Sequence, residues 1–421
     1  MNDRPARLVV SDDRGRSRLT VFFRLFLAIP HFVWLGLWTF AVFFTAIAQW
    51  FVTVVRARPA DPLQTFHVAY IRYATHVGAY LALAANPFPG FLGEPGYPID
   101  VELDAAERQP RLTAGSRFLL AIPAIFFLAL VNGGGSAGSL GGSFAVSGGV
   151  VLTAAFLGWF ACLALGEMPH GLRNVAAYGL RYTAETYAYV LLVTPTYPST
   201  DPTLPASAGP PPEHPVALDL NDDRGRSRLT TFFRLFLTVP HMVWLLLWGI
   251  AVFFAVIGQW FFALASGRPA VPLHRFLAAY VRYQTHVGAF LFMVANPFPG
   301  FTGRPGYPVD VYVAPPERQS RWVTFFRFFL GLPAFILSGA LSALLIASGI
   351  GGWFAALAIG RMPEGLRNAG AHALRYNAQV SAYATLLTDR YPFSGPPTLE
   401  PVEPIETPWA ETPLTPVDAP A

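Results

Sequence analysis

The chain has 421 residues, of which 53% are hydrophobic and 13% are charged, and its mean hydropathy is +0.41. This composition indicates a protein that lies in lipid, and it argues against two or three ordinary water-soluble domains. The net charge of +4 is small and dispersed, so we exclude nucleic acid as a partner.

An internal repeat organises the chain. The segment that begins at Arg18 has the sequence RLTVFFRLFLAIPHFVW, and it returns at Arg228 as RLTTFFRLFLTVPHMVW. A second, more divergent copy begins at Pro98, and two further copies begin near Val216 and Pro308, so we predict four units in two tandem halves. The predicted parts are units 7–97 and 98–198 in a first half (1–198), a proline-rich linker (199–215), units 216–307 and 308–393 in a second half (216–393), and a disordered tail rich in Pro and Glu (394–421).

Each unit combines a short extended segment, an amphipathic arm (Arg18 to Leu27 in the first unit), an apolar stretch and a more polar second helix. In the first unit the apolar residues of the arm fall at helical spacing, and Pro30 is expected to interrupt the helix because proline lacks an amide donor. The nearly uncharged stretch from Pro30 to Val55 is long enough to cross a bilayer. The segment from Pro62 to Asn86 is long enough to return, but it carries Arg72, whose insertion into lipid is costly.

The fold class that follows is an all-α integral membrane protein with four helical hairpins and about eight spans. Arginines are concentrated on the arm side of the units, and by the positive-inside rule this places the N-terminus, the linker and the tail in the cytoplasm. Two spans per unit would give every unit the same orientation. The alternative is four spans plus interfacial helices, in which alternate units would be inverted.

The second unit differs from the others by a Gly/Ser-rich run from Asn132 to Gly149. If the span begins at Pro123, this run lies at membrane depth, and a discontinuous helix of that kind would suggest transport. In the simpler interpretation, which we favour, residues 144–166 form the span and the run lies outside the membrane.

One arginine in each second helix is followed four residues later by another polar residue on the same helical face. The pairs are Arg72 and His76, Arg181 and Glu185, Arg282 and His286, and Arg375 and Gln379. As a functional hypothesis, these candidate anion- or lipid-binding residues line a polar seam. The alternative, which we favour because all four copies retain the arginine, is that they tie neighbouring helices together.

Another set of residues is predicted to anchor the helices at the membrane interface. These residues are Arg24, Trp50, Trp159, Arg234, Trp260 and Trp353. The sequence contains no recognised phosphate loop, nucleophile elbow or metal-binding helix motif. We therefore predict no catalytic residue, no metal and no cofactor.

Several of these motifs together resemble a known family. They are the FFR..LAIPH opening, the Trp-Phe pair, the Arg-Tyr of the second helix and the sequence TDRYP at Thr388 to Pro392. The chain is similar, in four copies, to the bacterial membrane family called domain of unknown function 4389 (DUF4389). The resemblance implies a multi-pass protein of the inner membrane, and it implies no known activity.

We therefore expect a non-catalytic scaffold or lipid-interacting protein whose partners are membrane lipids. The alternative is a small-solute or anion transporter or channel with an arginine-lined seam. A continuous water-accessible path lined by the second-helix arginines would favour transport. A seam sealed by helix contacts would favour the scaffold.

Overall fold

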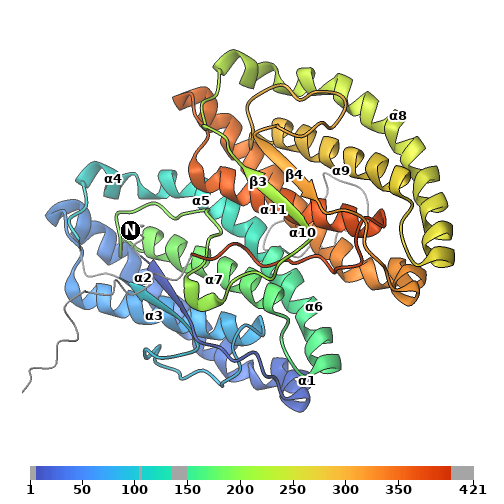
Figure 1. The fold of residues 1–421 in the computed structure, drawn as a ribbon. Helices are drawn as coiled ribbons and strands as arrows, with labels where there is room; N and C mark the ends of the chain where they lie inside the picture. Colours follow the sequence, from blue (N-terminus) through green and yellow to red (C-terminus); the bar gives the residue numbers. More distant parts are fainter. Residues whose placement is uncertain (1–5, 104–106, 134–148, 400–421) are drawn as a thin grey trace, which may run out of the picture.

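The computed structural model describes residues 6–103, 107–133 and 149–399, and these residues are mostly helical (Figure 1). Three helical stretches are long and apolar enough to cross a membrane: Arg18–Arg56, Arg228–Ser266 and Arg321–Ile359. The elements in chain order are β1 (Ala6–Val10), α1 (Arg18–Leu27), α2 (Ile29–Arg56), α3 (Asp61–Leu81), β2 (Ile99–Leu103), α4 (Arg111–Gly115), α5 (Arg117–Asn132), α6 (Val150–Leu165), α7 (His170–Val190), η2 (Ala206–Ala208), β3 (Val216–Leu220), α8 (Arg228–Ser266), α9 (Val271–Leu291), β4 (Val309–Val313), α10 (Arg321–Ile359) and α11 (Glu364–Ala384). We call α1 with α2, α4 to α6, α8 and α10 the long helices of the four units. The second helices are α3, α7, α9 and α11.

Each second helix packs against the long helix of its own unit. In the third unit the ring of Trp248 contacts the rings of Phe276, Tyr280 and Tyr283. A hydrogen bond of 2.7 Å joins Nδ1 of His241 to the hydroxyl of Tyr283. The first unit repeats these contacts between α2 and α3. The helical hairpin predicted for these units is therefore present.

The ends of the long helices follow from local sequence. The hydroxyl of Ser227 accepts a hydrogen bond from the amide of Thr230 and so caps the start of α8. The helix ends at Gly267, whose φ of 71° lies in the left-handed region that glycine adopts without strain. Ser320 and Gly360 have the same roles in α10.

The two units of each half are related by an approximate two-fold axis. Strand β1 pairs antiparallel with β2, and β3 pairs antiparallel with β4. The indole of Trp50, near the end of α2, donates to the carbonyl of Ala114 in α4 at 3.1 Å. In return, Trp159 near the end of α6 donates to the carbonyl of Val21 in α1 at 3.2 Å. The second half repeats both contacts, so the two long helices of a half run antiparallel.

We did not predict this antiparallel arrangement of the long helices from the sequence. The reason lies in the strands. Each strand precedes its own hairpin, and the strands of successive units pair antiparallel over five residues. The antiparallel strand pairing therefore places the two hairpins of a half in antiparallel orientation. A repeat in the sequence does not reveal this pairing.

Polar side chains of the long helices face the protein, and apolar side chains face outward. In α8 the side chains of Arg234, His241 and Gln259 are buried in a narrow stripe against the second helix. By contrast, Phe236 is 69% exposed and Phe254 is 66% exposed. This distribution is the reverse of that in water-soluble proteins, where large apolar side chains are buried.

The second helices lie between the long helices and the sheets. Helix α9 contacts α8 through Tyr280 and Tyr283, whereas it contacts β4 through Arg282 and His286. The sheet and the long helix therefore lie on different sides of α9. The buried core follows the second helices, with Ile71, Ala176 and residues of the other units in one cluster.

The interruption that we predicted at Pro30 is present, but the corresponding prolines of the other units do not interrupt their helices. A break occurs at Ala28 in the first unit, but Pro240 and Pro333 lie inside continuous helices. A proline removes one backbone hydrogen bond and bends a helix. Contacts with the second helix on both sides of Pro240 hold the remaining turns in place.

The linker and the predicted start of the tail pack together. The amide of Leu399 donates to the carbonyl of Leu204 at 2.9 Å, and Leu204 is fully buried. Residues 394–399 therefore belong to the fold, whereas we had placed the tail from residue 394. The predictions for the rest of the tail and for the Gly/Ser-rich run fall on residues 400–421 and 134–148, outside the described residues.

Candidate functional site

The arginine of each second helix binds the segment that follows that helix, which we call its exit segment. In the first unit, Arg72 lies 3.2 Å from Oδ1 of Asp100 in β2, and Nε2 of His76 donates to the same oxygen at 2.9 Å. In the third unit, Arg282 and His286 bind Asp310 in β4 in the same way. The sequence pattern pairs Arg72 with His76, and it does not predict Asp100 as the partner of both.

Hydrogen bonds set the charge of this aspartate. Burial alone would raise the pKa of Asp100, but hydrogen bonds from His76 and from the amides of Gly96 and Val101 outweigh burial and lower it. The pKa of Asp310 is lowered for the same reasons. Both carboxylates are therefore ionised at neutral pH and neutralise the arginine beside them.

In the second and fourth units the exit segment is bound through its backbone. Arg181 donates to the carbonyls of Thr203 and Asp201, and Glu185 accepts from the amide of Ser199 at 2.7 Å. In the fourth unit, Arg375 donates to the carbonyl of Gly395, and Gln379 accepts from the amide of Phe393 at 2.9 Å. All four pairs thus connect a second helix to its exit segment, whereas the alternative that we favoured from the sequence has them connect neighbouring helices.

The arm arginines bind the C-terminal ends of the second helices. Arg24 donates to the carbonyls of Tyr80 at 2.8 Å and Ala85 at 3.2 Å, and its guanidinium lies over the Tyr80 ring. Arg234 makes the matching contacts with Phe290 and Ala295. A cation at the C-terminus of a helix satisfies its free carbonyls and its dipole. Arg117 and Arg327 bind the corresponding segments in the other units.

This geometry corrects the role that we predicted for Arg24 and Arg234. Both side chains are 2% exposed, so neither is free to contact a lipid head group. The four tryptophans predicted as anchors are half-buried, and each joins the end of one long helix to the start of another. Their indoles bind the carbonyls of Ala114, Val21, Thr324 and Thr231, for Trp50, Trp159, Trp260 and Trp353 respectively.

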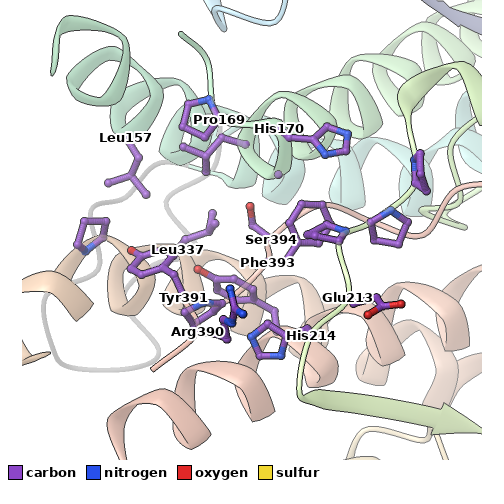
Figure 2. Close-up of a pocket in the computed structure, with 18 residues that line it drawn as sticks. Leu157, Pro169, His170, Glu213, His214, Leu337, Arg390, Tyr391, Phe393 and Ser394 are labelled. Carbon is purple, nitrogen blue, oxygen red and sulfur yellow. The ribbon is translucent and has the colours of Figure 1, made fainter. Parts of the chain in front are cut away.

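A cavity of about 670 Å³ lies between the two halves, and sequence reasoning did not find it (Figure 2). It is formed by α6, the start of α7, the linker, α10, α11 and the segment after α11. Its lining residues are Leu157, Pro169, His170, Gly171, Leu172, Pro210, Pro211, Pro212, Glu213, His214, Pro333, Leu337, Tyr376, Arg390, Tyr391, Pro392, Phe393 and Ser394.

The charged groups of this cavity come from segments outside the helices. The side chain of Arg390 is exposed and has no hydrogen bond or ion pair with any residue that the structure describes. Figure 2 shows it beside His214, with Glu213 on the opposite side and its carboxylate directed away. Burial lowers the pKa of both His170 and His214, so Arg390 is the positive charge of the cavity at neutral pH.

The residues of this cavity differ between corresponding positions of the second and fourth units, and these differences are visible in the sequence. TDRYP in the fourth unit corresponds to TPTYP in the second, so Arg390 corresponds to Thr196. His170 likewise corresponds to Glu364. Arg390 and His170 therefore each occur in one of these two copies, whereas our candidates were chosen because the copies agree.

The described residues contain no group of three or more His, Cys, Asp or Glu side chains that could hold a metal ion. Comparison with curated proteins gave no match, and comparison with solved structures gave none. The family model described as a domain of unknown function (DUF4389) matches residues 18–92, 228–302 and 321–394, which together exceed half of the chain. The chain therefore belongs to the DUF4389 family and contains its domain three times.

Proposed function

We propose that this protein is a membrane-embedded, non-catalytic scaffold that interacts with lipid through its long helices. The observation that carries this proposal is the outward face of those helices. Over the 39 residues of α8 the outward side chains are almost all apolar, and the one internal arginine, Arg234, is buried. Lipid is the environment in which such a surface is stable.

The length of these helices favours a position along the membrane. A helix of 39 residues is about 58 Å long at 1.5 Å per residue. The hydrocarbon core is only about 30 Å thick, and tilts rarely exceed about 40°. We infer that the long helices lie at a low angle to the membrane plane, with their outward faces immersed.

The sheets support the same inference. If antiparallel long helices crossed the bilayer, the two-stranded sheets that join their units would lie at membrane depth. The outer face of the first sheet carries Arg7 and Glu102, whose side chains are 65% and 58% exposed. Open sheet edges and exposed charges do not occur in hydrocarbon. We therefore place the sheets in water and the approximate two-fold axes along the membrane normal.

This placement replaces the eight spans of the sequence prediction with helices embedded from one side. It retains a common side for the N-terminus, the linker and the tail, which we propose is the cytoplasmic side of a bacterial inner membrane. We also propose that residues 98–198 are a diverged fourth copy of the domain. Arg117 and Trp159 make the contacts of their counterparts in the matched copies.

The transport alternative receives less support. It required a water-accessible path lined by Arg72, Arg181, Arg282 and Arg375. Each of these side chains is instead bound to the exit segment of its own unit. A sealed seam is the feature that we had associated with a scaffold.

Spin labels along α8 test the proposal. Phe236, Phe254 and Phe261 are similarly exposed and extend over 25 residues, or about 38 Å of helix. In vesicles, nitroxides at these positions should be accessible to oxygen, inaccessible to a water-soluble nickel complex, and similar in depth. A label at Tyr312 in β4 is the control, and it should be accessible to nickel. Depths that differ by tens of ångströms would contradict the low angle, and nickel access at Phe254 would contradict the membrane role.

A further inference from the structure

The cavity between the halves joins two chemically different regions. Leu157 in α6 and Leu337 in α10 form one side, and both helices expose apolar side chains on their outer faces. Pro333 also lines the cavity and is exposed on α10, so the cavity reaches the helix surface that we place in lipid. The other side consists of polar exit and linker segments.

The polar side holds one cation whose charge no described residue neutralises. A guanidinium presents parallel donors that match the oxygens of a phosphate group. Arg390 lies beside Tyr391 and His214, within a volume typical of ligand sites. An occupant that satisfies both sides must therefore carry a phosphate at one end and an apolar chain at the other.

We propose that this cavity binds a phospholipid, with the phosphate at Arg390 and part of one acyl chain against Leu157 and Leu337. This inference rests on the proposed function, because the lipid would enter from the membrane beside α10. It gives the scaffold a specific lipid site in addition to its general lipid-facing surface. The site breaks the internal symmetry, since the second unit has Thr196 and Phe127 where the fourth has Arg390 and Leu337.

The internal repeat supplies the test variants. Arg390→Thr and Leu337→Phe each introduce the residue that the corresponding position of the second unit already holds. The first removes the phosphate partner, and the second fills the apolar side. Arg304→Thr is the matched control, because Arg304 is exposed on a loop of the third unit and does not line the cavity.

The measurement is native mass spectrometry of the full chain in a neutral detergent, titrated with phosphatidylglycerol or with inorganic phosphate. We expect one tightly bound lipid in the wild type and in Arg304→Thr, and binding about tenfold weaker in Arg390→Thr, as expected for loss of a charge-assisted contact. Leu337→Phe should also weaken it. Equal lipid binding by Arg390→Thr and wild type would overturn the proposal, and so would displacement of the lipid by inorganic phosphate.

Flotation of the same variants with vesicles separates the two proposals. All four chains should float equally, because none of the changes alters the outward faces of the long helices. If the wild type fails to float, the membrane scaffold itself is wrong. If all chains float and bind lipid equally, only the cavity site is wrong.

Discussion

Replacing Arg234 by methionine should destabilise the protein strongly, although this arginine lies in a helix whose outer face is apolar. Its guanidinium donates to the carbonyls of Phe290 at 2.7 Å and Ala295 at 3.0 Å, and to Oδ1 of Asn296 at 3.1 Å. Leaving two buried carbonyls without this donor costs about 1–3 kcal/mol each. Relief from burying the charge offsets part of that cost. We expect a net loss of about 2–4 kcal/mol.

Arg228→Met is the matched control on the same helix. Arg228 is exposed and, among the described residues, donates only to the carbonyl of Ala358 at 3.0 Å, so its loss should cost at most about 1 kcal/mol. Thermal unfolding followed by tryptophan fluorescence in a neutral detergent compares the two variants. If Arg234 caps the end of α9, the difference in unfolding temperature between the two variants should persist in vesicles without anionic lipid. Equal unfolding temperatures for the two variants would refute the capping role, and a difference seen only with anionic lipid would restore the head-group role.

Three other substitutions test the contacts between segments. Asp310→Asn should remove an acid-dependent part of the free energy of unfolding. The pKa of Asp310 is lowered in the folded chain. Its stabilising contribution is therefore present above the unfolded pKa of 3.8 and is lost as the pH falls through the lower folded pKa. The unfolding temperature of the variant should therefore fall less than that of the wild type on acidification below pH 3.8, and a parallel fall would disprove the linkage. Gly303→Ala should destabilise by at least about 2 kcal/mol, because φ is +60° and the new Cβ would lie 2.2 Å from a backbone oxygen. Gly300→Ala, where the Cβ meets open space, should change the unfolding temperature little, and equal effects would show that the tight turn is not required. Trp260→Phe should cost about 1 kcal/mol through the lost indole hydrogen bond, as measured by thermal unfolding, and an unchanged unfolding temperature would remove this contact from the account.

The hairpins were predictable because they depend on local patterns. The serine before α8 and α10, the glycine after them and the helical spacing of apolar residues all act within a few residues. The arginine and its neighbour four residues later could be assigned to one helix face for the same reason. Their partner could not be identified, because Asp100 lies in a strand 24 residues after His76.

Our prediction for the arm arginines was wrong, and the cause is physical. A polar stripe on an apolar helix usually faces water or head groups, and Arg24 was assigned accordingly. In this protein the polar stripe faces the second helix, and the remaining surface faces outward. Periodicity identifies the stripe, but it does not show which side of the helix is buried.

The pairing of units and the cavity between the halves depend on contacts over long sequence distances. The antiparallel strand pairs orient the two hairpins of each half relative to each other. The linker contacts the segment after α11 through the backbone hydrogen bond between Leu204 and Leu399. Neither contact has a motif. Differences between the copies, such as Arg390 against Thr196, would have been a better guide to the cavity than their similarities.

Membrane attachment of the purified chain tests the central claim most directly. The chain is reconstituted in vesicles, treated with alkaline carbonate, and centrifuged through a density gradient without detergent. We predict that it floats with the lipid, because the exposed side chains of α2, α8 and α10 are mostly apolar. Recovery as a monodisperse protein in the dense aqueous fraction would contradict the claim.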